Sequence, residues 1–418
     1  MLFVYRILIN LILLISPLII FFRILKKKED PKRFKEKFCY FSKKRIEGKL
    51  LWFHGASVGE ILSILPILEK LESDKRVKQI LITSNTVSSS RILLNFNLKK
   101  TIHQFFPIDT KSHTKIFLEY WKPSVAIFID SEIWPNTLHN INQLNIPSIL
   151  LNARITKKTF NKWRIIFNFA KRVFGNFDFC LAASEESKNN LNKLHVKNLK
   201  YIGNLKYSAK NTFEELEDYN KKILDNFQTW CAASTHKDEE IIVLKTHLKI
   251  KKKYDNILTI IIPRHINRSS YIKDLSNKFN LNSQILNDGD LIKSNTEILI
   301  INSFGVISKY FNYCNNILVG KSFIKKLENI SGQNPIEAAK LGCKIFHGPY
   351  VYNFQEIYEH LSSFGVAEKV NNELELAQKI IINFEGSAIR NPKTVNLLNI
   401  YGEKILKETA KELHAYLK

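Results

Sequence analysis

Short apolar runs alternate with helical patterns along most of this chain, and no other feature restricts the fold as much. In the first half the strand candidates are residues 50–53, 79–83, 125–129, 148–151 and 179–182. A second series begins near Trp230 and comprises residues 230–233, 257–262, 297–301, 316–319 and 343–346. Because helical segments such as 60–72 and 136–142 separate these runs, the rhythm predicts parallel sheets with helices on both faces. The sequence therefore predicts an α/β chain of two doubly wound parallel-sheet domains that face a cleft.

The length of 418 residues is enough for two ordinary domains. A polar, helical stretch at 211–228 places their junction near 205–212. We predict a membrane anchor helix at 1–25, an N-terminal domain at 26–208 and a C-terminal domain at 209–418. The last helix, at about 396–417, is amphipathic and able to pack back on the N-terminal domain.

Residues 2–25 are almost entirely apolar, and a basic cluster that begins at Arg23 follows them directly. The unbroken part, residues 11–22, is shorter than the roughly 20 residues of a spanning helix, although counting from Ile7 makes a span possible. Positive flanks stay in the cytoplasm and attract anionic lipids. We expect a single N-terminal membrane anchor with the domains on the cytoplasmic side. A monotopic helix and a buried core helix are the alternatives.

The strong positive charge favours anionic partners. The formal net charge is +24, which suits a membrane surface, nucleic acid or a phosphorylated substrate, although a general drift toward Lys, Asn and Ile explains the same excess. No basic-plus-aromatic motif appears, so we do not expect nucleic acid as a partner.

The five cysteines are odd in number and widely spaced. With no metal-ligand motif beside them, we expect neither disulfides nor a metal or other cofactor.

A glycine turn follows the first strand candidate and ends in a carboxylate. The run H-G-A-S-V-G-E at 54–60 indicates a turn between a strand and a helix, where open α/β sheets bind ligands. Glu60 is a candidate base for a substrate hydroxyl. A helix N-terminal acid, stabilised by the dipole, explains Glu60 equally.

Two carboxylates, Asp130 and Glu132, follow the strand candidate 125–129 in the run D-S-E-I-W-P-N at 130–136. Active-site groups gather at this end of a strand. A helix N-cap with Glu132 in the first turn accounts for the same residues. Arg154 and Lys206 also follow strand-like runs, and they are either anion contacts or ordinary surface charges.

In the second half, Arg264 and His265 end a strand candidate and suit a phosphate, although a loop role explains His265 as well. The run S-G-Q-N-P-I-E at 331–337 leads small residues into Pro335 at a helix start, which offers free N–H groups to a phosphate. Glu337 could accept hydrogen bonds from ribose hydroxyls.

Together these motifs resemble those of the Kdo transferases of lipopolysaccharide synthesis, which move 3-deoxy-D-manno-octulosonic acid (Kdo) from CMP-Kdo to a lipid A precursor. The resemblance runs nearly end to end and keeps the order of the motifs. Besides the runs already quoted, it rests on N-A-R at 152–154, G-N-L-K at 203–206, A-S-T-H-K-D-E-E at 233–240, P-R-H at 263–265 and G-P-Y-V-Y-N-F at 348–354.

The resemblance implies a GT-B fold with the acceptor domain first and the nucleotide domain second. It implies that Glu60 is the general base, and that Asp130, Glu132 and Lys206 stabilise the transition state. Ser57, Gly59 and Arg154 are candidate contacts of the acceptor or of Kdo. The residues implied to hold the nucleotide are Arg264, His265, Phe304, Gly305, Val306, Gly332, Asn334, Pro335, Ile336 and Glu337.

The chain departs from the family pattern at three places. Asp130 stands where the family usually has the longer Glu. Ser331 replaces a glycine and Gln333 replaces the histidine of the usual G-G-H-N-P. Asn302 and Val306 replace both acids of the usual D-x-x-G-E-L, so the donor contacts are the part of the site that these changes affect.

We therefore expect an inverting glycosyltransferase that moves Kdo from CMP-Kdo to the lipid A precursor lipid IVA at the inner membrane. Another membrane-associated GT-B enzyme that uses a UDP-sugar is one alternative. A non-catalytic, membrane-bound polyanion-binding protein is the other.

Overall fold

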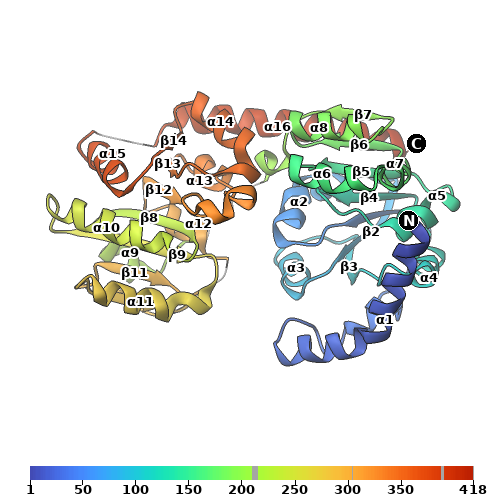
Figure 1. Cartoon of the computed structure of the whole chain (residues 1–418), viewed down its shortest axis with the longest axis horizontal. Coiled ribbons are helices and arrows are strands. Elements are labelled where there is room, and N and C mark those ends of the chain that lie inside the picture. Colours follow the sequence, from blue (N-terminus) through green and yellow to red (C-terminus); the bar gives the residue numbers. More distant parts are fainter. Residues whose placement is uncertain (210–214, 304, 387–389, 418) are drawn as a thin grey trace. The chain divides into compact units, whose positions relative to one another are not determined.

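The computed structural model describes residues 1–209, 215–303, 305–386 and 390–417, and the chain divides into two compact units. The first unit comprises Met1–Ala209 and Tyr401–Lys418, and the second comprises Lys210–Ile400. Each unit contains a parallel sheet of seven strands with helices beside it (Figure 1). The expected α/β class with two doubly wound parallel sheets is confirmed.

The sheet of the first unit has the strand order β3-β2-β1-β4-β5-β6-β7. Its strands are β1 Lys49–His54, β2 Val77–Ser84, β3 Thr101–Phe105, β4 Val125–Ile129, β5 Ser148–Ala153, β6 Phe179–Ala182 and β7 Leu199–Tyr201. The helices that connect them are α2 Val58–Glu72, α3 Val87–Ile92, α4 Lys111–Trp121, α5 Pro135–Gln143, α6 Lys157–Ile165, α7 Phe167–Phe174 and α8 Glu185–Lys193, and helix α1 Leu2–Leu25 precedes the sheet.

The strand order places a topological switch point between β1 and β4. From β1 the chain continues to β2 and β3 on one side, and then returns to add β4 to β7 on the other side. The crevice outside the carboxyl ends of two such strands is where open α/β sheets bind ligands. The turn after His54 and the turn after Ile129 both lie at this crevice.

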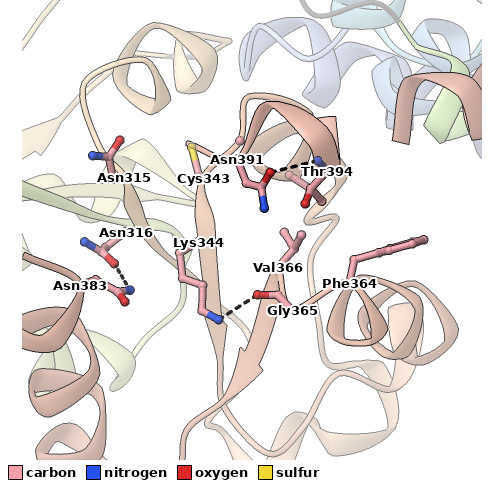
Figure 2. A pocket seen from close by; sticks show the side chains of 12 residues that line it. Asn315, Asn316, Cys343, Lys344, Phe364, Gly365, Val366, Asn383, Asn391 and Thr394 are labelled. Atoms are coloured by element: carbon pink, nitrogen blue, oxygen red, sulfur yellow. Dashed lines mark hydrogen bonds between the residues drawn. The ribbon is translucent and has the colours of Figure 1, made fainter. Parts of the chain in front are cut away.

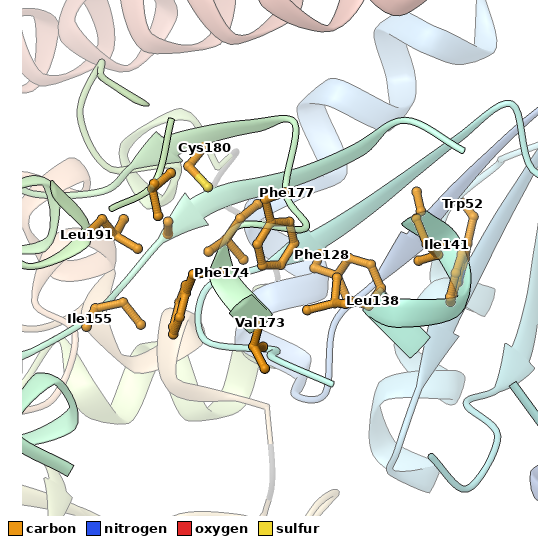
Figure 3. Packing of buried hydrophobic residues seen from close by; sticks show 14 of the residues in the cluster. Trp52, Phe128, Leu138, Ile141, Ile155, Val173, Phe174, Phe177, Cys180 and Leu191 are labelled. Atoms are coloured by element: carbon orange, nitrogen blue, oxygen red, sulfur yellow. The ribbon is translucent and has the colours of Figure 1, made fainter. Parts of the chain in front are cut away.

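The core explains why the central strands read as continuous apolar runs. Leu50 and Trp52 of β1 face a cluster that also contains Phe128 of β4. Figure 3 shows members of this cluster from Trp52 and Ile141 to Leu191. Successive side chains of a strand point to opposite faces, and Leu51 and Phe53 are also fully buried. Helices therefore cover both faces, as parallel sheets require.

The sheet of the second unit has the order β10-β11-β9-β8-β12-β13-β14, with its switch point between β8 and β12. Its strands are β8 Gln228–Thr235, β9 Ile257–Pro263, β10 Ser283–Leu286, β11 Ile298–Ile301, β12 Asn316–Val319, β13 Lys344–His347 and β14 Ala367–Lys369. Its helices are α9 Asp218–Leu224, α10 Glu239–Lys251, α11 Ser269–Lys278, α12 Ile307–Phe311, α13 Ile336–Lys340, α14 Gln355–Ser363 and α15 Glu373–Glu385, and they are followed by α16 Pro392–His414, whose residues from Tyr401 onward belong to the first unit.

Candidate active site

Glu60 lies in the first turn of α2, where it forms a capping box with Ser57. Its Oε2 accepts the N–H of Ala56 at 2.7 Å, and its Oε1 accepts the hydroxyl of Ser57 at 2.8 Å. The hydroxyl oxygen of Ser57 in turn accepts the N–H of Glu60 at 3.3 Å. Glu60 is thus a helix N-terminal acid, and the same position holds its carboxylate at the crevice between β1 and β4.

The environment of Glu60 changes its acidity. Burial, followed by the neighbouring carboxylates of Asp130 and Glu132, raises the pKa of the Glu60 carboxyl to about 7. The hydrogen bonds from Ser57 and Ala56 oppose this rise. A pKa near neutrality is the property that a general base needs, because such a group takes and returns a proton at physiological pH.

Asp130 forms an ion pair with Lys206 at the end of β4. Its carboxylate is buried, accepts a hydrogen bond from the side-chain amide of Asn152, and lies 3.3 Å from the Lys206 Nζ. The Asn152 Oδ1 accepts the N–H of Leu205 at 2.9 Å, and Leu205 begins the 3₁₀ turn Leu205–Ser208 that carries Lys206. One buried amide therefore connects both partners of the pair.

The φ angle of Asp130, +55°, gives a physical reason for the short acid at this position. Among residues other than glycine, Asp and Asn adopt the left-handed conformation most readily. A longer Glu side chain lacks the short local hydrogen bonds that favour this conformation.

Glu132 is held by two donors on one oxygen. The His54 Nε2 lies 3.0 Å from the Glu132 Oε2, and the indole N–H of Trp134 donates to the same oxygen at 2.9 Å. The His54 ring is fully buried, and its Nδ1 lies 2.9 Å from the hydroxyl of Thr83. Glu132 consequently has a fixed position beside Glu60.

The two glycines of the turn differ in their surroundings. A Cβ on Gly55 would lie 3.1 Å from Ile129 and 3.3 Å from the side chain of Glu60. A Cβ on Gly59 would meet nothing within 4 Å. A side chain on Gly55 would therefore crowd the packing under Glu60, whereas Gly59 leaves open space next to it. Arg154 follows β5 and is half-buried, and its N–H donates to the carbonyl of Asp130 at 3.0 Å.

In the second unit, Arg264 and His265 follow β9 and are exposed. The N–H of Arg264 donates to the carbonyl of Thr235, the last residue of β8, at 3.0 Å. The His265 ring lies 5.9 Å from the ring of His236. Burial lowers the pKa of His236 to about 4, so its imidazole is neutral at physiological pH beside two exposed basic side chains.

Gly332 belongs to a rigid backbone turn near these residues. Its φ is +84°, and a Cβ there would lie 3.1 Å from the Cα of Val351, so only glycine fits. Its N–H donates to the carbonyl of Lys321 at 2.7 Å. The buried carboxylate of Glu239 accepts the N–H groups of both Lys321 and His236, which connects Gly332 to the ends of β8 and β12.

The remaining predicted nucleotide residues lie at the starts of α12 and α13. Pro335 precedes Ile336, the first residue of α13, and Asn334 is exposed. Burial raises the pKa of the Glu337 carboxyl, and a hydrogen bond with Ser308 of α12 opposes that rise. This contact places Glu337 beside the segment that contains Gly305 and Val306. Phe304 lies outside the described residues.

A cavity of about 170 Å³ in the second unit contains none of the predicted site residues. Figure 2 shows its lining, which includes Asn316, Lys344 and Asn383. Asn316 and Lys344 are the first residues of β12 and β13. The cavity therefore lies at the amino ends of these strands, opposite to the edge where open α/β sheets bind ligands.

Sequence reasoning assigned no role to His54, Asn152 or His236, although each belongs to a quoted motif. Their contacts cross from one strand end to another, so the sequence alone does not show them. In the described parts of the chain, no group of three or more His, Cys, Asp or Glu side chains is arranged to hold a metal ion. All five cysteines are free thiols.

The family model and the relatives that match this chain carry the same description. Residues 32–209 match a family model described as 3-deoxy-D-manno-octulosonic-acid transferase (kdotransferase). A 3-deoxy-D-manno-octulosonic acid transferase of Rickettsia bellii is 31% identical over 400 residues, which cover 95% of this chain and 93% of the relative. A protein of the same name from Haemophilus influenzae is 27% identical and covers 91% of each chain.

A solved UDP-N-acetylglucosamine 2-epimerase shares the architecture, with a TM-score of 0.59 over 88% of this chain and 97% of that chain. Its sequence identity is 12%, so the likeness shows the fold alone. That fold is the GT-B class, with two doubly wound units.

Proposed function

Because the chain belongs to the family of 3-deoxy-D-manno-octulosonic acid transferases, which are glycosyltransferases, we propose that it moves Kdo from CMP-Kdo to lipid IVA with inversion at the anomeric carbon. The hydroxyl of the acceptor sugar attacks the anomeric carbon of Kdo, and the bond to the phosphate of CMP breaks. The acceptor proton passes to Glu60, and CMP leaves with the bonding electrons.

The observation that carries this proposal is the carboxyl of Glu60, which has a pKa of about 7 at the crevice between β1 and β4. A base of this strength is typically worth about 10²–10⁴-fold in rate. Asp130 and Glu132 supply negative charge beside the oxocarbenium-like carbon, and Lys206 balances the carboxylate of Kdo or the departing phosphate. Ser57, Gly59 and Arg154 contact the acceptor or the Kdo residue in this proposal.

The second unit holds the donor in this proposal. Arg264 and His265 face the phosphate, and Gly332 with the segment 334–337 surrounds the rest of CMP. The exposed cationic side chain of Arg264 and the backbone turn at Gly332 support this assignment. The segment at Gly305 and Val306 contributes further contacts, and no metal is needed to balance the phosphate.

Helix α1 attaches the enzyme to the cytoplasmic side of the inner membrane, where its acceptor is found. The helix has 24 residues, and its most apolar stretch of 18 residues has a mean hydropathy of 2.5 and is only 11% buried in the protein. The basic segment that follows α1 would contact anionic lipid head groups.

The decisive experiment supplies the purified protein with CMP-Kdo and lipid IVA and identifies the product by mass. Transfer of Kdo supports the proposal, and Glu60→Gln should abolish it while the protein stays folded. Glu119→Gln, at an exposed position of α4, is the matched control and should keep full activity. Stabilisation by UDP but not by CMP would instead support a UDP-sugar enzyme. Binding of polyanions that is strongly salt-dependent and indifferent to Glu60, with no transfer, would support a non-catalytic role.

A further inference from the structure

Both ends of α1 are bound to the first unit. Near its start, the hydroxyl of Tyr5 donates to the buried carboxylate of Asp109 at 2.7 Å, and the Arg6 Nε donates to the Asn136 Oδ1 at 3.0 Å. Asn136 belongs to α5, and Asp109 precedes α4. Figure 1 shows the N-terminus beside these two helices. The beginning of α1 is therefore part of the globular unit.

The other end of α1 is bound through the segment that follows it. The Arg23 Nε and the Lys37 Nζ both contact the Oε2 of Glu29, at 3.0 and 2.7 Å. The Glu29 side chain is almost fully buried. The carbonyl of Lys37 accepts the N–H of Ile108 at 3.0 Å. Ile108 is the neighbour of Asp109, so both ends of α1 connect to the same loop before α4.

One side of α1 is less exposed than the other along its length, with Ser16 and Ile20 buried. The shielded or partly shielded positions are 2, 5, 6, 9, 13, 16, 20, 23 and 24, whose spacing of three and four residues defines one face of a helix. The opposite face is apolar and exposed, with Phe3 at 74% and Leu14 at 77% of full exposure. The helix thus presents one continuous apolar face to the surroundings.

A spanning orientation conflicts with these contacts. The 24-residue helix is about 36 Å long, enough to cross a hydrocarbon core of about 30 Å. Crossing would place its two ends in opposite aqueous compartments, whereas the structure binds both ends to one unit. It would also separate Tyr5 and Arg6 from their partners and place them in or beyond the hydrocarbon.

We infer that α1 lies flat in the membrane interface, with its exposed apolar face among the lipid chains and both ends on the side of the first unit. The occupant of this face is an anionic bilayer surface. This inference rests on the membrane attachment proposed above and specifies its geometry. Helices of this kind bury their apolar face about 5–10 Å into the boundary between head groups and acyl chains.

Charge at both ends of α1 supports a lipid occupant. Lys26, Lys27 and Lys28 are exposed directly after the helix. At its start, Met1 and Leu2 line an open groove of about 800 Å³ together with Lys171, Arg172 and Lys197. A flat helix brings both basic groups to one anionic leaflet, whereas a spanning helix would place one group on the opposite side.

The test measures the depth of spin labels on the full-length protein in vesicles of phosphatidylglycerol and phosphatidylethanolamine. In a Cys39→Ser background, single cysteines replace Leu8, Ile15 and Phe22, which share the exposed face. The expected result is one shallow depth for all three labels. A label at Leu13, on the shielded face, is the matched control and should be protected from both oxygen and a water-soluble nickel complex.

Two results would overturn the inference. A spanning helix would place the label at residue 15 deepest and the labels at 8 and 22 near opposite head groups. A second copy of the chain covering the face would protect all three labels from both relaxing agents. Labelling with a membrane-impermeant maleimide adds an independent check, because a cysteine placed before Met1 and one replacing Lys411 should react from the same side of sealed vesicles. None of these measurements depends on transfer activity. A result that contradicts the flat orientation of α1 would therefore not contradict the proposed reaction.

Discussion

The Nε2 of His54 lies 3.0 Å from the Oε2 of Glu132, and the imidazole ring is fully buried. His54 is the last residue of β1, and Glu132 follows β4, so this contact joins the two strands of the switch point. It fixes the charge of Glu132 near Glu60, where that charge helps to raise the pKa of the base. His54 is thus a positioning residue for the proposed reaction.

Replacing His54 by Phe should lower the midpoint of the pH–rate profile, because a released Glu132 raises the pKa of Glu60 less. Loss of the hydrogen bonds that the buried imidazole makes with Glu132 and Thr83 should also cost about 1–3 kcal/mol of unfolding free energy. His54→Gln keeps an N–H donor and should restore the midpoint. A purely structural role would instead lower the stability of the Phe variant and leave its midpoint at the wild-type pH.

Transfer by the wild-type protein should increase with pH through about 7, because only the ionised form of Glu60 accepts a proton. Stability should change in the opposite direction. The carboxyl titrates near 4.5 when unfolded and near 7 when folded, so the folded state binds more protons between these values. The free energy of unfolding should therefore fall as the pH rises from about 4.5 to about 7, and Glu60→Gln should remove this component. Identical pH–stability curves for the two proteins would contradict the assignment.

Asp130→Asn should reduce transfer and lower the pH midpoint, since the charge of Asp130 contributes to the raised pKa of Glu60. The substitution keeps the shape of the side chain but removes the negative charge 3.3 Å from the Lys206 Nζ, in a site where the lysine side chain is only 15% exposed. Such a loss is worth about 1–3 kcal/mol for a charged hydrogen bond. Asp130→Asn combined with Lys206→Met should recover stability without recovering transfer, which chemical denaturation and product mass would show.

The two glycines of the turn give a matched pair. Gly55→Ala should destabilise the protein and displace Glu60, because the added methyl lies within 3.1–3.3 Å of Ile129, Glu60 and Ile61. Gly59→Ala should keep or slightly raise stability, since its methyl points into open space and alanine favours the helix α2 that contains this position. If the acceptor sugar occupies the open space beside Gly59, Gly59→Ala should raise the KM for lipid IVA without lowering the Tm. Equal kinetics in Gly59→Ala and wild type would remove Gly59 from the acceptor site.

Substitutions of two arginines in the second unit, Arg264 and Arg268, should have different effects on CMP binding and on stability. Arg264 is exposed at the end of β9, and Arg264→Ala should weaken the rise in Tm that CMP causes, without lowering the Tm of the free protein. Arg268 pairs with both oxygens of Glu240, whose side chain is fully buried. Arg268→Ala should lower the unfolding free energy by about 3–5 kcal/mol. It should not change the rise in Tm that CMP causes. If Arg264→Ala keeps the stabilisation by CMP and Arg268→Ala removes it, the donor does not bind at Arg264.

The central strands of both sheets were predictable from sequence, and the edge strands were not. β1, β4 and β8 are buried on both faces and therefore appear as continuous apolar runs. The four strands that the sequence reading missed, β3, β7, β10 and β14, are the four sheet edges. β7 and β14 have three residues each, and their patterns L-K-Y and A-E-K carry no apolar run. Their pairing depends on a neighbouring strand that local sequence does not reveal.

The individual residues of the candidate site were predictable from sequence, but most of the contacts between them were not. Glu60, Asp130 and Lys206 each follow a strand or turn signal, and a parallel sheet brings such positions to one edge. The contacts that set their chemistry were not predictable, because Asn152 and His54 act across strands. The choice between a capping role and a base role for Glu60 was also open in the sequence. The structure shows the capping contacts and, on the same carboxyl, a pKa raised to about 7, so the capping role does not exclude the proposed role as base.

The capping box of α2 has a consequence for the timing of each reaction cycle. The Ser57 hydroxyl and the Ala56 N–H donate to the Glu60 carboxylate, and a protonated carboxyl is a weaker hydrogen-bond acceptor than a carboxylate. If Glu60 is the base, these hydrogen bonds weaken at every turnover, and the first turn of α2 loses part of its cap until the proton leaves. The helix would then loosen and re-form in step with catalysis, and amide hydrogen exchange at the start of α2 would become faster during turnover than at rest.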